Sequence, residues 1–351
     1  MSFWAEPQGA ARLKLGILKR YLGVFAAKTG STAPNRRVCY FDGYAGQGFY
    51  EDGSPGSPAT AATAAAIYRH RPRTIDGFLV EKDPGRFVTL TNSAEQGGWG
   101  SWQLREGEAS QYVSEMLTWA GSAPLLAFID PFALGVPYAQ LVEILSRAQT
   151  TEVLLNVSKH GIRRFSGHLT GHGHAARDSF IEKMDTSLGG QWWRDLVLEN
   201  EASDEAARDI SSIFCQRIAQ DSGCGRYVTP IKDRLDGPID YYLLLLTRHP
   251  DGLWLFNEAV SKTVDEEKRY QAETNLQFFF DETDALINRI YGHITSDPDQ
   301  FAGYELRSKI GPIRRHNRAC PVHPRPEGLG PTTGAGHPQQ LAQRHQGPES
   351  L

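Results

Sequence analysis

Residues 40–48 read YFDGYAGQG, and the interpretation of the whole chain starts from this stretch. An apolar run, VCYF, ends in an acid and is followed by a segment of small residues. That order predicts a strand that runs into a tight loop, where bare backbone can approach a ligand closely. The glycines are spaced GxxGxG, which differs from the GxGxxG of dinucleotide-binding loops, and no GK[ST] follows as in a Walker loop.

Strand-like apolar runs alternate with helix-forming segments beyond this loop, which predicts βαβ units and a mostly parallel sheet covered on both faces. Two later strand candidates, at 226–232 and 240–249, have no helix between them and should pair as an antiparallel hairpin. This α/β plan resembles the Rossmann-like sheet of class I methyltransferases, which has five parallel strands and a late antiparallel hairpin. The five predicted parallel strands lie at 37–42, 77–82, 102–107, 125–130 and 152–158.

The same patterns divide the chain into segments. Residues 1–36 form a predicted N-terminal helical segment, and residues 37–250 form the Rossmann-like domain with a helical insertion at 159–222. Residues 251–310 are predicted to form a small C-terminal helical module. Residues 311–351 contain no Phe, Trp or Tyr and are dense in Pro, Gly, Gln and His, so we expect a disordered tail that cannot bury enough apolar surface to fold.

Composition limits the classes of function. The net charge is −4, so any contact with nucleic acid requires a local basic patch rather than a global positive field. The four cysteines form no CxxC pair, which gives no indication of a zinc site or a disulfide framework. The longest apolar run, at 241–247, is too short to span a bilayer, and the N-terminus lacks the pattern of a signal peptide. We therefore expect a cytoplasmic protein.

The segment DGYAGQG resembles motif I of S-adenosylmethionine-dependent amino-methyltransferases, usually Asp-Pro-Phe-Ala-Gly-Ser-Gly. Gly43 and Gln47 stand where that motif has proline and serine. The resemblance implies that the loop, Gly43 included, lies against the methionine part of the cofactor and that the acid pairs with its ammonium group. A plain connection from strand to turn is the alternative. The residues that match the motif are Asp42, Tyr44, Ala45, Gly46 and Gly48.

Acids also end the next two predicted strands. The resemblance implies that Glu81 accepts hydrogen bonds from the ribose hydroxyls, a role that acids also take in dinucleotide folds. Gly107 and Glu108 follow the third strand, where methyltransferases often contact the adenine. A solvated acid at the strand end is the alternative for Glu81. The interval from Asp42 to Glu81 is about twice the roughly 20 residues expected for one strand–helix–strand unit. The additional residues include GSPGSP, which can form a loop over the cofactor or a surface loop without a function.

The segment FIDPFAL at 128–134 resembles motif IV of amino-methyltransferases, usually Asp-Pro-Pro-Tyr or Asp-Pro-Pro-Phe. Asp130, Pro131 and Phe132 match, and the second proline is missing. The resemblance implies that Asp130 and the adjoining carbonyl accept hydrogen bonds from a target amine, and that Phe132 stacks on the ring that carries it. Ordinary turn chemistry of an Asp-Pro pair is the alternative.

Over roughly residues 4–290 the chain resembles the three-Cys-motif partner proteins (TcmP). The resemblance implies a methyltransferase-like domain and a partner with a three-cysteine motif of the radical-S-adenosylmethionine type, but no defined substrate. It rests on RLKLGILKRYL, YFDGYAGQGFYEDGSPGSP, FLVEKD, FIDPF, a tryptophan-pair insert and YYLLLLTRHPDGLWLF.

Other polar segments have two interpretations each. Lys159, Arg163 and Arg164 follow the fifth predicted strand and can bind nucleic acid phosphates or form a solvated basic turn. The insert's adjacent tryptophans, at 192 and 193, can stack a base or pack in a core. The histidines at 168, 172 and 174 lack a nearby acid or cysteine, so we expect a polar loop and no metal.

Two functions remain. The first is a methyltransferase that uses S-adenosylmethionine to modify a nitrogen of nucleic acid. The second is a non-catalytic partner, with or without bound S-adenosylmethionine, of a three-Cys-motif protein. A nicotinamide enzyme is disfavoured by the glycine spacing and by the late hairpin.

Overall fold

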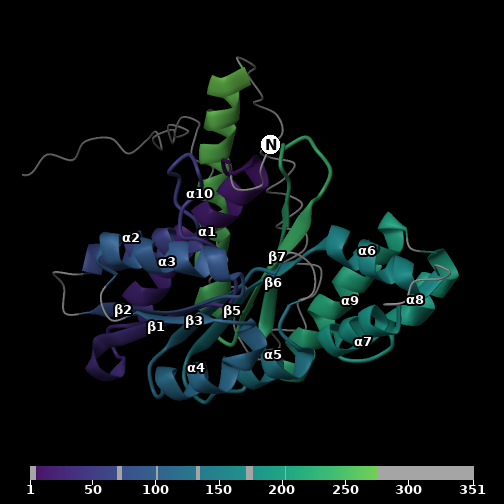
Figure 1. Ribbon diagram of the computed structural model, residues 1–351, viewed down its shortest axis with the longest axis horizontal. Coiled ribbons are helices and arrows are strands. Elements are labelled where there is room, and N and C mark those ends of the chain that lie inside the picture. The colour runs from purple at the N-terminus through teal and green to yellow at the C-terminus, as the bar shows by residue number, and fades with distance from the viewer. Residues whose placement is uncertain are drawn as a thin grey trace, which may run out of the picture. The chain divides into compact units, whose positions relative to one another are not determined.

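A seven-stranded sheet with strand order β3-β2-β1-β4-β5-β7-β6 forms the centre of the computed structural model (Figure 1). The structure describes residues 5–68, 73–99, 102–131, 135–170, 177–201 and 203–275. The pairs among β1 to β5 are parallel, whereas β7 pairs antiparallel with both β5 and β6. The predicted fold class is therefore confirmed. The strands are β1 Arg37–Asp42, β2 Thr74–Glu81, β3 Gln103–Glu106, β4 Leu125–Ile129, β5 Thr151–Val157, β6 Gly225–Ile231 and β7 Tyr241–Thr247.

The central strands are apolar on both faces because helices cover both sides of the sheet. Alternate residues belong to two separate cores, as the period of two along a strand requires. In β1, for example, Val38 and Tyr40 enter one core, and Cys39 and Phe41 enter the other.

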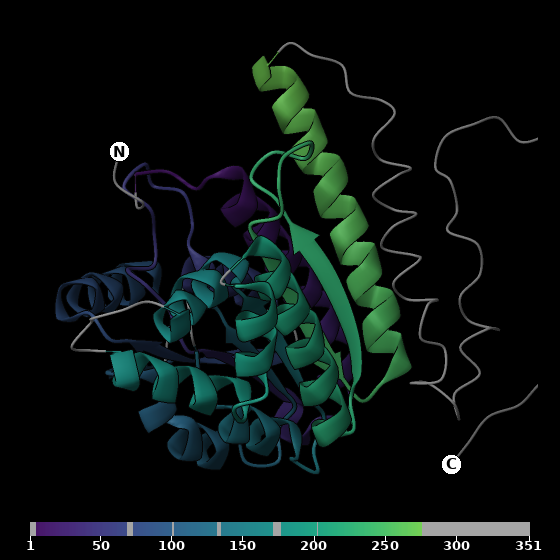
Figure 2. The same cartoon turned by 90° about the vertical axis from the view of Figure 1, so that its right-hand side faces the viewer.

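Four helices contribute to the first core: α1 Gly9–Thr29, α2 Ser57–Tyr68, α3 Pro84–Gly97 and α10 Pro250–Asn275. Helix α1 lies beside α10, and Figure 2 shows how α10 follows the antiparallel end of the sheet.

Local sequence explains the bounds of α3. Asp83 caps its N-terminus by accepting from the backbone N–H of Arg86, Pro84 occupies its first turn, and Gly98 ends it in the left-handed conformation.

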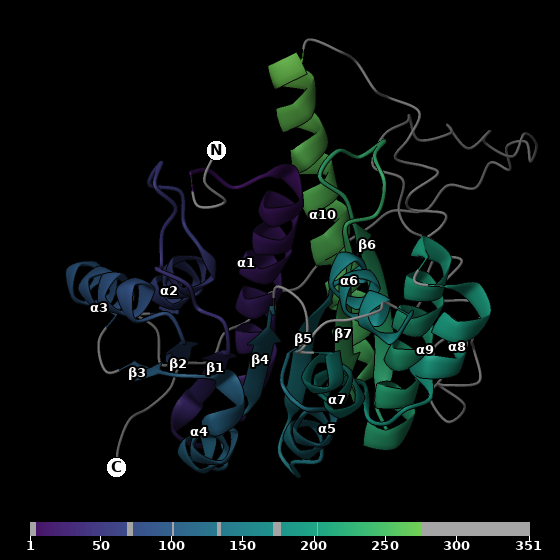
Figure 3. The ribbon, with the colours of Figure 1, turned by 45° about the vertical axis from the view of Figure 1, so that its right-hand side comes forward.

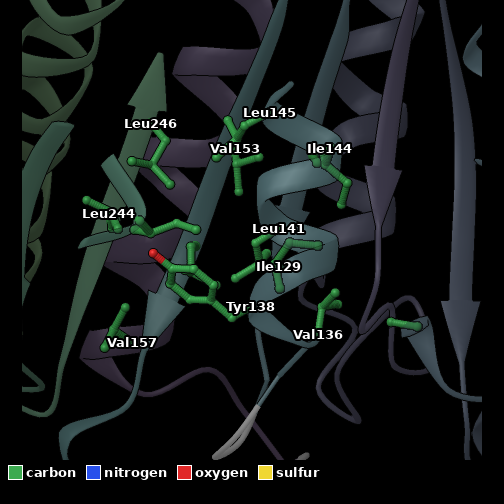
Figure 4. Close-up of a cluster of buried hydrophobic side chains, with 14 of the residues drawn as sticks. Ile129, Val136, Tyr138, Leu141, Ile144, Leu145, Val153, Val157, Leu244 and Leu246 are labelled. Atoms are coloured by element: carbon green, nitrogen blue, oxygen red, sulfur yellow. The ribbon is translucent and has the colours of Figure 1, made fainter. Parts of the chain in front are cut away.

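The second core lies under α4 Val113–Ala120 and α5 Tyr138–Leu145. In Figure 4, Leu141 and Ile144 of α5 face Ile129 and Val153 of the sheet. Two short 3-10 helices, Pro34–Arg36 and Ala109–Gln111, complete the connections. No helix in the described residues is long and apolar enough to cross a membrane.

Residues 159–222, expected to be a helical insertion, contain four helices in their described parts, and these helices pack on one another (Figure 3). Trp193 is fully buried and Trp192 packs against the same core, so both tryptophans serve packing rather than an open stacking surface. Helix α10 covers the start of the expected C-terminal module, and the remainder of that module and the expected tail lie outside the described residues. The four helices are α6 Lys159–Thr170, α7 Arg177–Leu188, α8 Trp193–Asn200 and α9 Asp204–Ser222.

Candidate functional site

Four polar side chains lie in a row at the carboxyl ends of four neighbouring strands. In the order of the sheet they are Glu81 on β2, Asp42 on β1, Asp130 directly after β4 and Asn156 on β5. Each sits at an even interval from residues of the first core, such as Leu79, so all four belong to the same face of the sheet. We call these four residues the polar row. In open α/β sheets, ligands bind at this carboxyl edge.

The glycine-rich loop after β1 has the backbone shape that glycine permits. Gly46 and Gly48 adopt φ values of 64° and 92°, which residues with a side chain rarely adopt. Ala45 N–H donates to the carbonyl of Val80 at 2.9 Å, which joins the loop to the end of β2. A Cβ at Gly43 would lie 3.1 Å from the Cβ of Ala109, so the 3-10 helix after β3 packs directly on this loop.

Asp42 is fully buried and stabilises the same loop. Its carboxylate accepts from the hydroxyl of Tyr40 at 3.0 Å, from the backbone N–H of Tyr44 at 3.1 Å and from the hydroxyl of Ser57. Burial raises the pKa of Asp42 to about 6, with a smaller contribution from the charge of Asp130, while the three hydrogen bonds oppose the rise. A carboxylate offers about four acceptor positions, so about one remains for a ligand.

Glu81 is 5% exposed, and each of its oxygens accepts one backbone N–H. Gly46 donates to Oε2 and Asp83 to Oε1, both at 2.8 Å, and the guanidinium of Arg86 lies 4.0 Å from Oε1. Each oxygen therefore keeps about one free acceptor direction. Two such directions on one carboxylate match the two adjacent hydroxyls of a ribose.

The surplus segment between β1 and α2 forms a small hairpin over residues 49–55. Phe49 and Pro55 form an antiparallel bridge, and Gly56 N–H donates to the carbonyl of Gly48 at 2.9 Å. The hairpin also contacts the N-terminal segment, because Asp52 N–H donates to the carbonyl of Ala5 at 3.0 Å. By returning to the glycine-rich loop, the hairpin brings Ser57 within reach of Asp42.

Asp130 is held by two residues that the sequence did not single out. Lys14 of α1 donates to Oδ2 and forms an ion pair, and the side-chain amide of Asn156 donates to Oδ1 at 2.7 Å. The Lys14 ammonium also lies 5.3 Å from the centre of the Tyr241 ring. Burial first, and then the negative charge of Asp130, raise the pKa of Tyr241 and of Tyr50, the latter to about 12. Asp130 is thus held between a cation and an amide, and the cation itself lies against the ring of Tyr241.

The other predicted cofactor residues have local partners. Tyr44 is partly buried against the second core, and its pKa is raised by burial and then by the charges of Glu108 and Asp130. Gly107 has a φ of 146° and donates its N–H to the carbonyl of Glu81 at 3.0 Å. Glu108 forms a capping box with Gln111 at the 3-10 helix. Pro131 is buried next to the polar row, and Phe132 lies outside the described residues.

The basic residues after β5 form ion pairs with α9. Lys159 and Arg163 lie 3.3 Å and 2.9 Å from the carboxylate of Asp204, and the guanidinium of Arg164 lies 5.2 Å from the centre of the Phe165 ring. Their position at the start of α6 places them at the same edge of the sheet as the polar row. A phosphate would have to compete with Asp204 for Lys159 and Arg163.

Of the two partners of Asp130, the sequence carried a signal for Asn156 and none for Lys14. Asn156 lies two residues after Leu154 in a strand of period two, so its face was readable from the sequence. Lys14 belongs to a helix, and only tertiary packing brings it to a strand end more than a hundred residues later.

Of the three clustered histidines, His168 stacks on Phe180 at 4.4 Å between ring centres, and His172 and His174 lie outside the described residues. Within the described residues, no group of three or more His, Cys, Asp or Glu side chains is placed to hold a metal ion.

No protein-family model and no curated protein matches this sequence. Among solved structures, the chain is similar to the O-methyltransferase TomG from Streptomyces achromogenes, involved in tomaymycin synthesis and crystallised with SAM. The identity is 13%, the match covers 65% of this chain and 79% of TomG, and the TM-score is 0.34. It is also similar to the DszA carbon methyltransferase at 11% identity and a TM-score of 0.30, over 60% of this chain and 47% of that one. At these scores the assignment of the fold rests on strand order alone.

Proposed function

We propose that this protein is a methyltransferase that uses S-adenosylmethionine to modify a nitrogen of nucleic acid. The observation that carries the proposal is the polar row, which places two loop-binding acids next to a third acid whose partner Lys14 lies against the Tyr241 ring. In this proposal, Glu81 and Asp42 at one end of the row bind the cofactor, and Asp130 at the other end binds the methyl acceptor.

The residues at the cofactor end fit S-adenosylmethionine. Glu81 keeps two free acceptor directions for the ribose hydroxyls, and Asp42 keeps one for the ammonium group. Gly46 and Gly48 adopt positive φ values and carry no side chain that would separate the loop backbone from a ligand. When bound, the cofactor supplies a methyl group already activated by its sulfonium. The protein therefore has to position the acceptor and to exclude water, and it needs little further acid–base machinery.

At the acceptor end, Asp130 accepts hydrogen bonds from nitrogen donors, as its contacts with Lys14 and Asn156 illustrate. The Tyr241 ring, which lies 5.3 Å from the Lys14 ammonium, adds an aromatic surface near this end, and bases stack on aromatic side chains in many nucleic acid complexes. In this proposal Lys159, Arg163 and Arg164 contact phosphates, exchanging their present partners for the backbone of the substrate.

A second candidate is a non-catalytic partner of a three-Cys-motif protein, and one observation favours it. Asp42 and Asp130 already have protein donors, so the polar row is stable without a ligand. In that case the row would be structural, and the protein would act through its neighbour.

Calorimetric titration of the purified full chain with S-adenosylmethionine tests the proposal. We expect binding with a micromolar Kd and at least a tenfold loss in Glu81→Ala, because that variant lacks the ribose acceptors. Glu143→Ala, which removes an exposed carboxyl on α5, is the matched control and should bind normally. The absence of binding at millimolar cofactor would contradict the enzyme function and favour the partner function.

A further inference from the structure

Lys14 places a primary amine beside the polar row. Its ammonium group donates to Oδ2 of Asp130 and forms an ion pair with that carboxylate, although the two residues are 116 positions apart in the chain. The ammonium also lies 5.3 Å from the centre of the Tyr241 ring. The Tyr241 hydroxyl in turn donates to the carbonyl of Ala10, one turn earlier in α1, at 2.6 Å. The amine is therefore held in one place by a carboxylate and a ring.

The polar row reaches the surface of the protein at this ion pair. The side chains of Lys14 and Asp130 are 14% and 18% exposed, whereas Asp42, Glu81 and Asn156 are all buried. The amine is thus within reach of a ligand that binds from solvent at this end of the row.

The packing of α1 does not require an amine at position 14. The helix already contributes apolar side chains such as Leu13, Ile17 and Leu18 to the first core. A partly buried ion pair is a weak source of stability, because the loss of water around both charges offsets much of their attraction. The position of the Lys14 amine therefore points to chemistry at the row.

Asp130 is a close neighbour of Asp42, the residue that binds the methionine part of the cofactor in the proposed function. In the pairing of β1 with β4, Asp42 lies opposite Phe128, and Asp130 follows two residues later on the same face. The spacing of strands and the rise per residue put the two Cα atoms roughly 8 Å apart. The charge of Asp130 contributes, after burial, to the raised pKa of Asp42. The Lys14 amine thus adjoins the place where the reactive methyl group would be bound.

We propose that Lys14 is a site of self-methylation: its amine accepts a methyl group from S-adenosylmethionine bound to the same chain. This inference rests on the proposed function and goes beyond it, because the acceptor is a side chain of the protein itself. Asp130 and the Tyr241 ring hold the nitrogen in position before the reaction. Such positioning within one molecule supplies a large part of the rate of a transfer.

The transfer balances without a further reactant. The Lys14 ammonium first releases one proton to Asp130, whose exposed side chain passes it to solvent. The lone pair of the nitrogen then forms a bond to the methyl carbon, while the sulfur–carbon bond breaks and its electron pair stays on the sulfur. The products are a methylated ammonium and S-adenosylhomocysteine. The methylated ammonium keeps its charge and two N–H groups, so it keeps its contacts with Asp130 and Tyr241.

Mass spectrometry of peptides from the full chain tests this inference. The chain is incubated with S-adenosylmethionine that carries a deuterated methyl group, so new transfer is distinguished from methylation during expression. We expect the label on Lys14 and none on Lys19, an exposed lysine of the same helix. An unlabelled methyl group already present on Lys14 supports the inference if Glu81→Ala, expressed in parallel, lacks it, and overturns the inference if Glu81→Ala carries it equally.

A mixture of two variants distinguishes transfer within one chain from transfer between chains. Glu81→Ala keeps Lys14 but lacks the ribose acceptors, and Lys14→Arg keeps the cofactor residues but lacks the amine. We expect no label on Lys14 in the mixture. Label on the Lys14 of Glu81→Ala would show that a different chain modifies it, which overturns the inference.

Cofactor analogues give a readout that does not depend on methyl transfer. Sinefungin carries a protonated amine where S-adenosylmethionine has its methylsulfonium group, and S-adenosylhomocysteine is uncharged there. If Lys14 adjoins that position, its ammonium repels sinefungin. Calorimetry should then show that Lys14→Met raises the affinity for sinefungin, relative to S-adenosylhomocysteine, at least threefold. Lys19→Met is the matched control and should leave the ratio unchanged. An unchanged ratio in Lys14→Met overturns the inference, because the lysine then only anchors α1.

The other outcomes are equally decisive. Binding of S-adenosylhomocysteine without any label on Lys14 overturns this inference alone. Equal labelling of Lys14 and Lys19 shows chemical methylation by the reagent and also overturns it. Failure of both S-adenosylmethionine and S-adenosylhomocysteine to bind overturns the proposed function and this inference with it. If circular dichroism shows that Lys14→Met is unfolded, the labelling of the unchanged chain and of the mixture decides the matter.

Discussion

The conformation of Gly48 determines the shape of the loop that we propose binds the cofactor. Its φ of 92° is unfavourable for any side chain, and a Cβ there would lie 3.2 Å from Ser93 and 3.3 Å from Trp99. We expect Gly48→Ala to lower the free energy of unfolding by about 1–3 kcal/mol and to weaken S-adenosylmethionine binding at least tenfold by shifting the loop.

Gly53 is the matched control for this change. It has a φ of 83° at the hairpin, with nothing within 4 Å of its Cβ position, so Gly53→Ala carries backbone strain without a clash. Urea unfolding and calorimetry on both variants check the prediction. Equal loss of cofactor affinity in the two variants would show that strain alone, and not the position of Gly48 in the loop, weakens binding.

Asp42 makes stability depend on pH. Its pKa is raised from 3.8 to about 6 in the folded protein, so the folded state binds this proton more tightly than the unfolded state does. The resulting stabilisation is fully present below pH 3.8 and is lost as the pH rises through 6. We therefore expect the free energy of unfolding of Asp42→Asn, relative to the unchanged protein, to increase by about 2–3 kcal/mol between pH 3.5 and 7.5.

Urea unfolding at pH 3.5 and at pH 7.5 measures this difference. Glu143→Gln, at an exposed carboxyl, serves as the control and should show no comparable change between the two pH values. A constant difference between Asp42→Asn and the unchanged protein at both pH values would show that the carboxyl is not perturbed by burial.

At the scale of elements, helix α1 is fixed to the sheet by two polar contacts, one to the residue after β4 and one to β5. Lys14 reaches Asp130 at the carboxyl end of β4, and Tyr21, two turns later, donates to Glu152 near the amino end of β5 at 2.6 Å. Thr247 of β7 donates to the same carboxylate at 2.7 Å. Glu152 thus joins α1, β5 and β7, and the backbone of Gly252 in α10 approaches it closely.

We expect Tyr21→Phe to destabilise the protein more at pH 8 than at pH 5.5. Burial raises the pKa of Glu152 from 4.5 to about 7, so its stabilising contribution is complete below pH 4.5 and is lost as the pH rises through 7. The Tyr21 hydroxyl lowers that pKa, so its loss leaves the charged form with one donor fewer. The expected cost at pH 8 is about 1–3 kcal/mol.

Urea unfolding at both pH values measures this effect, and Tyr68→Phe is the control. The Tyr68 hydroxyl donates to the uncharged carbonyl of Gly23 at 2.8 Å, so its removal should have the same cost at either pH. A cost of Tyr21→Phe that is independent of pH would mean that Glu152 does not titrate between pH 5.5 and pH 8.

At the scale of the whole molecule, the expected tail at 311–351 remains a prediction from composition. We expect brief trypsin treatment to cut first at Arg314, Arg315 or Arg318, because exposed and unstructured segments fit a protease active site. Arginines such as Arg12, which pairs with Glu267, should be cut much later. Mass spectrometry of the fragments measures the order, and early cleavage at Arg12 would contradict the prediction.

The whole molecule also shows how far sequence patterns reach. The alternation of strands and helices predicted the five parallel strands and the antiparallel hairpin, since period and turn chemistry are local properties. The same local reading placed Asp42, Glu81 and Asp130 at strand ends. It did not reveal that Asp42 and Glu81 also bind the glycine-rich loop itself, because the loop conformation depends on the strands beside it.

The sequence by itself determined the order of the elements, the face of each strand and the acids at the strand ends, because these follow from spacing along the chain. Only the tertiary structure decided which residues meet. Lys14 reaches Asp130, Asp130 lies beside Asn156, and the hairpin at 49–55 returns Ser57 to Asp42. Such contacts join residues far apart in the chain. They depend on strand order and helix packing, which are settled by burying both faces of one sheet and not by any local pattern.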